Sequence, residues 1–159
     1  MLLYKALGAI VIFACGIETA RRLNARLTGE NERTEKYILL LRYIKAQIGC
    51  FALPIGEILA RAEASLLAGC GWRRESAPTS LEQMLAEAGL GDRTSQGILL
   101  EFCKDFGRSY LDEQIRRCDH YITLLEERQV SVGKDIPRRK KLNSTLCISG
   151  ALALIILLI

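Results

Sequence analysis

Apolar residues are concentrated at the two ends of the chain. Residues 1–17 carry one charge, on Lys5, and residues 142–159 carry none. An α-helix rises about 1.5 Å per residue, so a segment of about 18 residues reaches about 27 Å, close to the hydrocarbon thickness of a bilayer. A helix from a soluble core would also show a polar face, which the last stretch lacks. The pattern therefore predicts a hydrophobic anchor helix at each end.

Between the two ends, apolar residues recur at the spacing of one helix face. The stripe expected to be buried in residues 32–50 consists of Tyr37, Leu41, Ile44 and Ile48. Two later stripes consist of Ile98, Phe102 and Phe106, and of Ile115, Cys118, Ile122, Leu125 and Gln129. The sequence predicts an all-α fold, in which a compact bundle of about five helices lies between the anchors.

Helix-breaking and capping residues predict where these helices begin and end. The Thr28, Gly29 and Asn31 segment is expected to break the first helix. Leu53-Pro54 precedes a helix expected over 55–67, which a loop follows over 68–78. These signals divide the chain into an N-terminal anchor with a basic segment (1–27), a helical domain (28–137), and a basic flank with the C-terminal anchor (138–159).

Three capping signals predict the starts of the later helices. Thr79-x-x-Glu82 forms a capping box for a short helix that runs to Ala88, and Asp92 is the expected cap of the next helix. Ser109-x-x-Asp112 has the same pattern before the last domain helix. Gly133 and Pro137 are expected to end or kink that helix ahead of the basic flank.

Basic residues flank both apolar ends on the side of the domain, and they are the predicted determinants of membrane topology. They are Arg21, Arg22 and Arg26 after the first segment and Arg138, Arg139, Lys140 and Lys141 before the second. Positive flanks are retained in the cytoplasm. We therefore expect a cell-membrane protein whose domain faces the cytoplasm and whose termini lie outside. Two alternatives for the first segment are an interfacial helix and a signal peptide with Cys15 as a lipidated residue.

Charge and side-chain chemistry exclude several classes of function. Residues 18–137 hold 17 Lys+Arg and 18 Asp+Glu, so the domain lacks the basic excess of a nucleic-acid-binding protein. The six cysteines form no C-x-x-C pair, and no glycine-rich segment has the spacing of a nucleotide-binding loop. We expect no metal, no cofactor, no small-molecule substrate and no enzymatic activity. A membrane-bound hydrolase or lipid-modifying enzyme that uses His120 with Asp119 or a cysteine stays open as an alternative.

Several short motifs resemble one known family. They are Glu18-Thr19-Ala20-Arg21, Ala46-Gln47-Ile48, Leu53-Pro54-Ile55-Gly56-Glu57-Ile58-Leu59, Leu100-Glu101-Phe102-Cys103-Lys104-Asp105-Phe106-Gly107-Arg108-Ser109 and Asp112-Glu113-Gln114. Together with the apolar start and the basic-flanked apolar end, they make nearly the whole chain resemble the stage III sporulation protein AB family of endospore-forming bacteria. Two departures are Tyr110-Leu111, where the family has a longer linker, and Pro137 before the last anchor.

The resemblance implies a part of the mother cell's channel complex at the forespore outer membrane. It also implies a domain similar to the cytoplasmic domains of the inner-membrane platform proteins of type II secretion and type IV pilus systems. The expected function is a non-enzymatic scaffold whose partners are the membrane, a secretion-type ATPase (the family's protein AA) and other proteins of the channel complex. A platform module of a pilus or general secretion system is the alternative.

Exposed charges suggest where a partner would bind. Arg73 and Arg74 lie in the expected loop, and Glu126 and Glu127 lie in the expected last helix of the domain. Charged side chains on a helical surface are most often simply solvated. These four residues are therefore only a first hypothesis for a partner contact.

Overall fold

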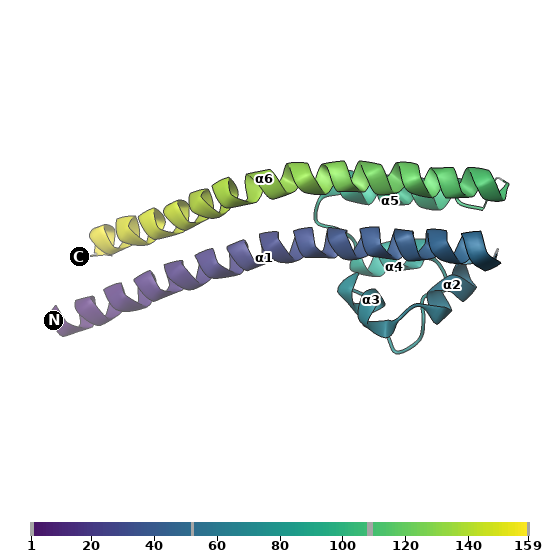
Figure 1. Ribbon diagram of the computed structural model, residues 1–159. Coiled ribbons are helices and arrows are strands. Elements are labelled where there is room, and N and C mark those ends of the chain that lie inside the picture. Colours follow the sequence, from purple (N-terminus) through teal and green to yellow (C-terminus); the bar gives the residue numbers. More distant parts are fainter. Residues whose placement is uncertain (1, 52, 108–109, 159) are drawn as a thin grey trace. The chain divides into compact units, whose positions relative to one another are not determined.

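The computed structural model describes residues 2–51, 53–107 and 110–158, and within these residues the regular structure is entirely helical. The six helices are α1 (Leu2–Phe51), α2 (Ile55–Arg61), α3 (Ala64–Gly69), α4 (Leu81–Ala88), α5 (Arg93–Asp105) and α6 (Leu111–Leu158) (Figure 1). The all-α prediction is confirmed. The chain divides into a terminal unit, Met1–Gly29 with Gly133–Ile159, and a central unit, Glu30–Val132.

Helix α1 continues through the segment where a break was predicted. All 50 of its residues are helical, so the predicted break at Thr28–Asn31 is wrong. The Thr28 hydroxyl donates to the carbonyl of Asn24, and the Thr34 hydroxyl donates to the carbonyl of Glu30. Bonds of this kind satisfy a hydroxyl inside a helix. A single internal glycine costs only about 1 kcal/mol, which a helix of this length tolerates.

Helix α6 likewise runs through the residues that were expected to end it. Gly133 and Pro137 both lie inside its 48 residues, so the predicted helix end ahead of the basic flank is wrong. Proline removes one backbone hydrogen bond and crowds the preceding turn, at a cost of about 3 kcal/mol. The turns on either side keep their own hydrogen bonds and continue the helix. The alternative, that Pro137 kinks the helix, stays a prediction.

The third predicted helix is two helices in the structure. Pro54 precedes α2, as predicted, but α2 ends at Arg61 and α3 begins at Ala64. Between them Ala62 and Glu63 are extended, with ψ of 145° and 132°. Alanine and glutamate are good helix formers, so nothing local marks this break. It redirects the chain so that Leu59 of α2 and Leu67 of α3 are both buried.

Helices α4 and α5 begin at capping residues, one of them shifted from its predicted position. Ser80, rather than Thr79, is the N-cap of α4, and its hydroxyl accepts from the backbone N–H of Gln83 at 3.1 Å. Thr79 instead donates from its N–H and its hydroxyl to the Gln83 side chain. Asp92 caps α5 as predicted. Ser109, the expected cap of the last domain helix, lies outside the described residues.

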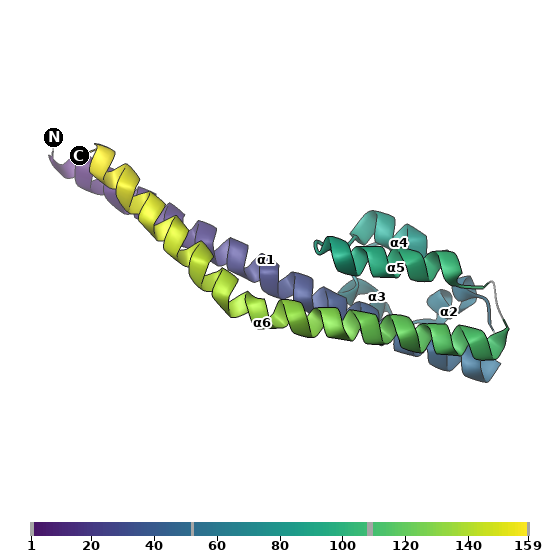
Figure 2. The ribbon, with the colours of Figure 1, turned by 90° about the horizontal axis from the view of Figure 1, so that it is seen from above.

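The core of the central unit is built from the predicted stripes together with α2 and α4. Its largest fully buried side chains are Tyr37, Phe102, Leu40, Leu41, Ile44, Ile58, Leu59, Leu81, Met84, Leu85, Leu99 and Leu125. In Figures 1 and 2, α5 lies along the part of α6 within this unit, and α4 lies beside α5. Burial raises the pKa of Tyr37, whose hydroxyl donates to the carbonyl of Ala88 at the end of α4.

The terminal unit is a pair of antiparallel helical segments, the N-terminal part of α1 and the C-terminal part of α6 (Figures 1 and 2). A Cβ added at Gly16 would lie 2.9 Å from Cβ of Ala151 and 3.2 Å from the carbonyl oxygen of Cys147. Further along the pair, the Asn24 amide donates to the Ser144 hydroxyl at 3.1 Å. Small residues let the two backbones come close together.

One of the described helices, α6, is long and apolar enough by itself to cross a membrane, and the bent pair α1 and α2 would supply a second. The most apolar 18-residue window of α6 has a mean hydropathy of 1.4, and 6% of it is buried within the chain. A helix of a soluble core with this composition would be mostly covered. The chain therefore has one or two candidate membrane-spanning helices.

Candidate functional site

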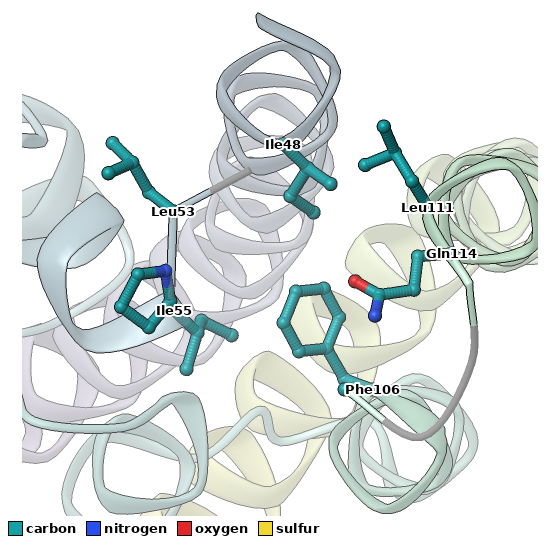
Figure 3. Close-up of a pocket in the computed structure, with 8 residues that line it drawn as sticks. Ile48, Leu53, Ile55, Phe106, Leu111 and Gln114 are labelled. Carbon is teal, nitrogen blue, oxygen red and sulfur yellow. The ribbon is translucent and has the colours of Figure 1, made fainter. Parts of the chain in front are cut away.

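The central unit contains an open pocket of about 550 Å³, where α1 and α5 end and α2 and α6 begin (Figure 3). Its lining residues are Ile48, Leu53, Pro54, Ile55, Phe106, Gly107, Leu111 and Gln114. A pocket of this volume is within the range that binds a small molecule or one or two side chains of a peptide. Residues at the ends of four different helices contribute to its wall.

Turn chemistry shapes the pocket. Pro54, at φ −66° and ψ 149°, ends the connection from α1 and starts α2. Gly107 has φ +79°, a left-handed conformation that few other residues adopt without strain, and it turns the chain after α5. The two turns leave Ile55 and Phe106 on either side of the opening (Figure 3).

The pocket wall combines aromatic packing with one amide. Phe106 is only partly buried, and its ring centroid lies 5.3 Å from that of Phe102, which is buried in the core. Figure 3 shows the Phe106 ring and the Gln114 amide pointing toward each other beside Ile48. A wall made almost entirely of apolar side chains suits an apolar side chain of a binding partner.

Large apolar side chains near the pocket are exposed to solvent. Leu111, which lines the pocket, has 42% of its surface exposed, and the preceding residue Tyr110 has 93% exposed. Phe51, the last residue of α1, has 63% exposed. Exposed aromatic and aliphatic residues beside a pocket are a common feature of protein-binding surfaces.

The charged residues proposed as partner contacts lie on two different elements and have different neighbours. Arg74, in the loop before α4, pairs with Glu87 at 2.8 Å, and its guanidinium lies 5.7 Å from the centre of the Trp72 ring. Arg73 is exposed beside it. On α6, Glu126 pairs with Arg42, whereas Glu127 is exposed.

The predicted topology determinants all lie in the terminal unit. Arg21, Arg22 and Arg26 are exposed on α1, and Arg22 pairs with Glu18 at 3.0 Å. On α6, Lys140 is half-buried, and Arg138, Arg139 and Lys141 are exposed. The structure thus places two basic groups, more than 100 residues apart in sequence, on one antiparallel helix pair.

Asp119 and His120, which were considered for catalysis, each interact with a different residue of the central unit. Asp119 pairs with Lys45, and the His120 ring is exposed with its centroid 5.4 Å from that of Tyr121. Burial raises the pKa of Cys70 to about 12 and that of Cys118 to about 11, so both stay thiols at neutral pH. Among the described residues, no group of three His, Cys, Asp or Glu side chains is placed to hold a metal ion.

The pocket was not predicted from the sequence, although two motifs of the resemblance contribute to it. Leu53-Pro54-Ile55 and Phe106-Gly107 were assigned structural or motif roles along the chain, more than 50 residues apart. Only the fold shows that both segments lie at the same pocket. The sequence did hold one signal, because Tyr110 and Leu111 follow the Phe106-Gly107 segment and belong to none of the predicted buried stripes.

A family model described as stage III sporulation protein AB matches residues 5–159, nearly the whole chain. No curated protein and no solved structure gives a match.

Proposed function

Because the chain belongs to the stage III sporulation protein AB family, we propose that it is a non-enzymatic, membrane-anchored scaffold of the sporulation channel complex. Family membership implies a role in that complex. The more specific proposal is that the central unit docks a secretion-type ATPase, the family's protein AA, at the cytoplasmic face of the mother-cell membrane around the forespore. Other proteins of the channel complex would contact the same scaffold.

The observation that supports a scaffold most directly is the division of charge and burial between the two units. The terminal unit contains nine of the lysines and arginines and only two carboxylates, Glu18 and Asp135. The central unit contains 13 Lys+Arg, 16 Asp+Glu and a core of its own. An apolar, basic-flanked hairpin joined to a separately packed domain suits a protein that holds a partner at a membrane surface.

We propose the pocket of the central unit as the docking surface for the ATPase. An apolar anchor side chain of the partner would enter between Phe106 and Ile55, and Leu111 and Phe51 would contact its flanks. Buried aromatic and aliphatic anchors contribute most of the binding energy in interfaces of this kind. Arg73, Arg74, Glu126 and Glu127 would then contribute at most a polar rim, where single charges change affinity little.

The test compares two substitutions of exposed apolar residues on α6. Leu111→Glu places a charge in the pocket wall, whereas Val130→Glu, the matched control, changes a residue with 56% of its surface exposed on the same helix. Co-purification of the ATPase with the full chain, from membranes of sporulating cells, should fall at least tenfold for Leu111→Glu and stay unchanged for Val130→Glu. Spore formation should fall in parallel.

Other outcomes would change the proposal in defined ways. If Leu111→Glu binds the ATPase as well as the unsubstituted chain while Arg73→Glu does not, the docking surface is the loop before α4 and the pocket assignment is wrong. If deletion of the protein leaves spore formation unaffected, the scaffold is not part of the sporulation complex, and the platform of another secretion or pilus system becomes the better hypothesis.

A further inference from the structure

The terminal unit carries the net positive charge of the protein, and most of its basic residues lie in one part of the helix pair. On α1, Arg21 and Arg22 lie between Gly16, which packs against Cys147 and Ala151, and Asn24, which bonds to Ser144. On α6, the stretch between these same contacts contains Leu146. The two arginines of α1 are therefore level with an apolar residue of α6.

The basic residues 138–141 of α6 lie close to this part of the helix pair, a few residues before Ser144 in the chain. Lys141 and Lys140 follow Ser144 on the side away from Cys147, as Arg26 follows Asn24 on α1. Because a helix rises about 1.5 Å per residue, the residues from Arg21 on one helix to Arg138 on the other occupy a band about 14 Å high, three residues on one side of the Asn24–Ser144 contact and six on the other. We call Arg21, Arg22, Arg138, Arg139, Lys140 and Lys141 the basic band.

Exposed leucines lie within and beside the basic band. Leu142 and Leu146 have 58% and 59% of their surface exposed, at the same level as the exposed guanidinium groups of α1. If this part of the helix pair lay in water, the leucines would be exposed to solvent at a cost in free energy. If it lay in the hydrocarbon core of a bilayer, the arginines would have no polar partners. The lipid headgroup region satisfies both, because arginine reaches phosphate while leucine contacts the upper acyl chain.

Carboxylates of the terminal unit neutralise little of this charge. Glu18 pairs with Arg22, but both side chains are largely exposed at 53% and 80%. Exposed ion pairs of this type contribute little and exchange readily with a stronger anionic partner. Arginine binds phosphate oxygens in a bidentate arrangement that a single carboxylate pair does not prevent.

We propose that the basic band binds the phosphate groups of anionic lipids and so enriches them around this protein. The proposal rests on the membrane anchoring argued above and goes beyond it, because topology requires only positive charge and not a lipid preference. Since the arginines of α1 and the lysines of α6 come together only when the two segments pair, the preference depends on the folded hairpin.

The test uses the full chain reconstituted in phosphatidylcholine vesicles that contain a trace of spin-labelled phosphatidylglycerol or spin-labelled phosphatidylcholine. The motionally restricted fraction of each label gives the relative association constant of the two lipids. The unsubstituted chain should prefer phosphatidylglycerol, and Arg21→Gln with Arg22→Gln should reduce that preference at least about fivefold. Lys140→Gln with Lys141→Gln should do the same.

The matched control removes the same charge from the central unit. Arg93→Gln with Lys104→Gln changes two exposed basic residues there and should leave the lipid preference unchanged. High salt should weaken the preference of the unsubstituted chain, whereas millimolar inorganic phosphate should not displace the labelled lipid.

Two results would overturn the lipid proposal alone. The first is a preference for phosphatidylglycerol that is equal in the unsubstituted chain and in the variants of the basic band. The second is complete displacement of the labelled lipid by inorganic phosphate, which would mean that the basic band is a site for free anions. Extraction of the chain from vesicles by alkaline carbonate would overturn the membrane anchoring itself, and with it the lipid proposal. Circular dichroism of each variant separates these results from a loss of folding.

Discussion

Asp92 accepts hydrogen bonds from two helices at once. It caps α5 by accepting from the backbone N–H and the hydroxyl of Ser95, and it accepts from two nitrogens of Arg128 on α6, at 2.9 and 2.7 Å. The Arg128 hydrogen bonds hold the pKa of the Asp92 carboxyl well below its usual range. The cap was predictable from the sequence, whereas the link to α6 depends on how α5 packs.

Substitutions of Asp92 should separate its two roles. Asn keeps the N-cap but loses the charge, so Asp92→Asn should destabilise the chain less than Asp92→Ala, with a difference of about 1 kcal/mol from the cap. A carboxyl with a depressed folded-state pKa stabilises fully above its unfolded pKa of about 3.9, and loses this contribution as the pH falls through the folded value. Urea unfolding in detergent micelles should therefore show a gap between the unsubstituted chain and Asp92→Asn that is full at pH 7 and narrows below about pH 4.

The same experiment tests the structure of this contact. A gap that stays constant from pH 7 to pH 3 would mean that the Asp92 charge does not contribute to stability through Arg128. A variant that keeps a cation, Arg128→Lys, provides the control, because it retains charge but not the bidentate geometry. It should fall between the unsubstituted chain and Asp92→Asn at pH 7.

At the scale of elements, local signals predicted helix starts better than helix ends. Pro54 and Asp92 marked true starts, because fixed φ and a side-chain acceptor act within one turn. The break at Ala62–Glu63 had no local signal, since it serves the burial of α2 and α3 against the same core. The expected break at Thr28–Asn31 failed because a glycine and capping-type residues disfavour a helix too weakly to end it.

The pocket could be predicted only in part for a related reason. Periodicity placed Ile98, Phe102 and Phe106 on one stripe, and the structure buries Phe102 in the core but leaves Phe106 partly exposed at the pocket. A stripe shows which face of a helix is apolar. It does not show that the neighbouring helices end before covering the last turn of α5.

Gly16 provides a test of the helix pair in the terminal unit. A leucine there would overlap Ala151 and the Cys147 carbonyl, so Gly16→Leu should force the two segments apart at a cost of about 1 to 3 kcal/mol. A side chain at Gly150 would meet nothing within 4 Å, so Gly150→Leu is the matched control in the same unit. The measurement is maleimide modification of Cys147, half-buried in the structure, in micelles with the other cysteines replaced.

The expected result is a faster modification of Cys147 in Gly16→Leu and an unchanged rate in Gly150→Leu. Equal rates in all three proteins would mean that Gly16 does not pack against α6 in solution. Faster modification in both variants would indicate that any added bulk disturbs the segment, and the close approach at Gly16 would lose its support.

At the scale of the whole molecule, the orientation proposed for the central unit follows from its basic flanks. Testing that orientation requires a cysteine that the fold leaves accessible to a labelling reagent. Cys70 is unsuitable, because it is fully buried and its burial raises the pKa of the thiol to about 12. It would resist a maleimide on either side of the membrane. Cys50, near the end of α1 in the central unit, is exposed and suits the purpose.

A chain that retains Cys50 alone should therefore escape a membrane-impermeant maleimide in intact cells and react after the cells are opened. A cysteine appended after Ile159 in a second chain should react in intact cells, because the proposed topology has the termini on the opposite side of the membrane from the central unit. The positive-inside argument depends on both results, since each anchor was oriented by its own flank. If Cys50 reacts in intact cells, the central unit lies outside the cytoplasm. An ATPase that uses cytoplasmic nucleotide could then not dock on the pocket. A lipid attached at Cys15 of the N-terminal segment would become the better account of how the chain is held at the membrane.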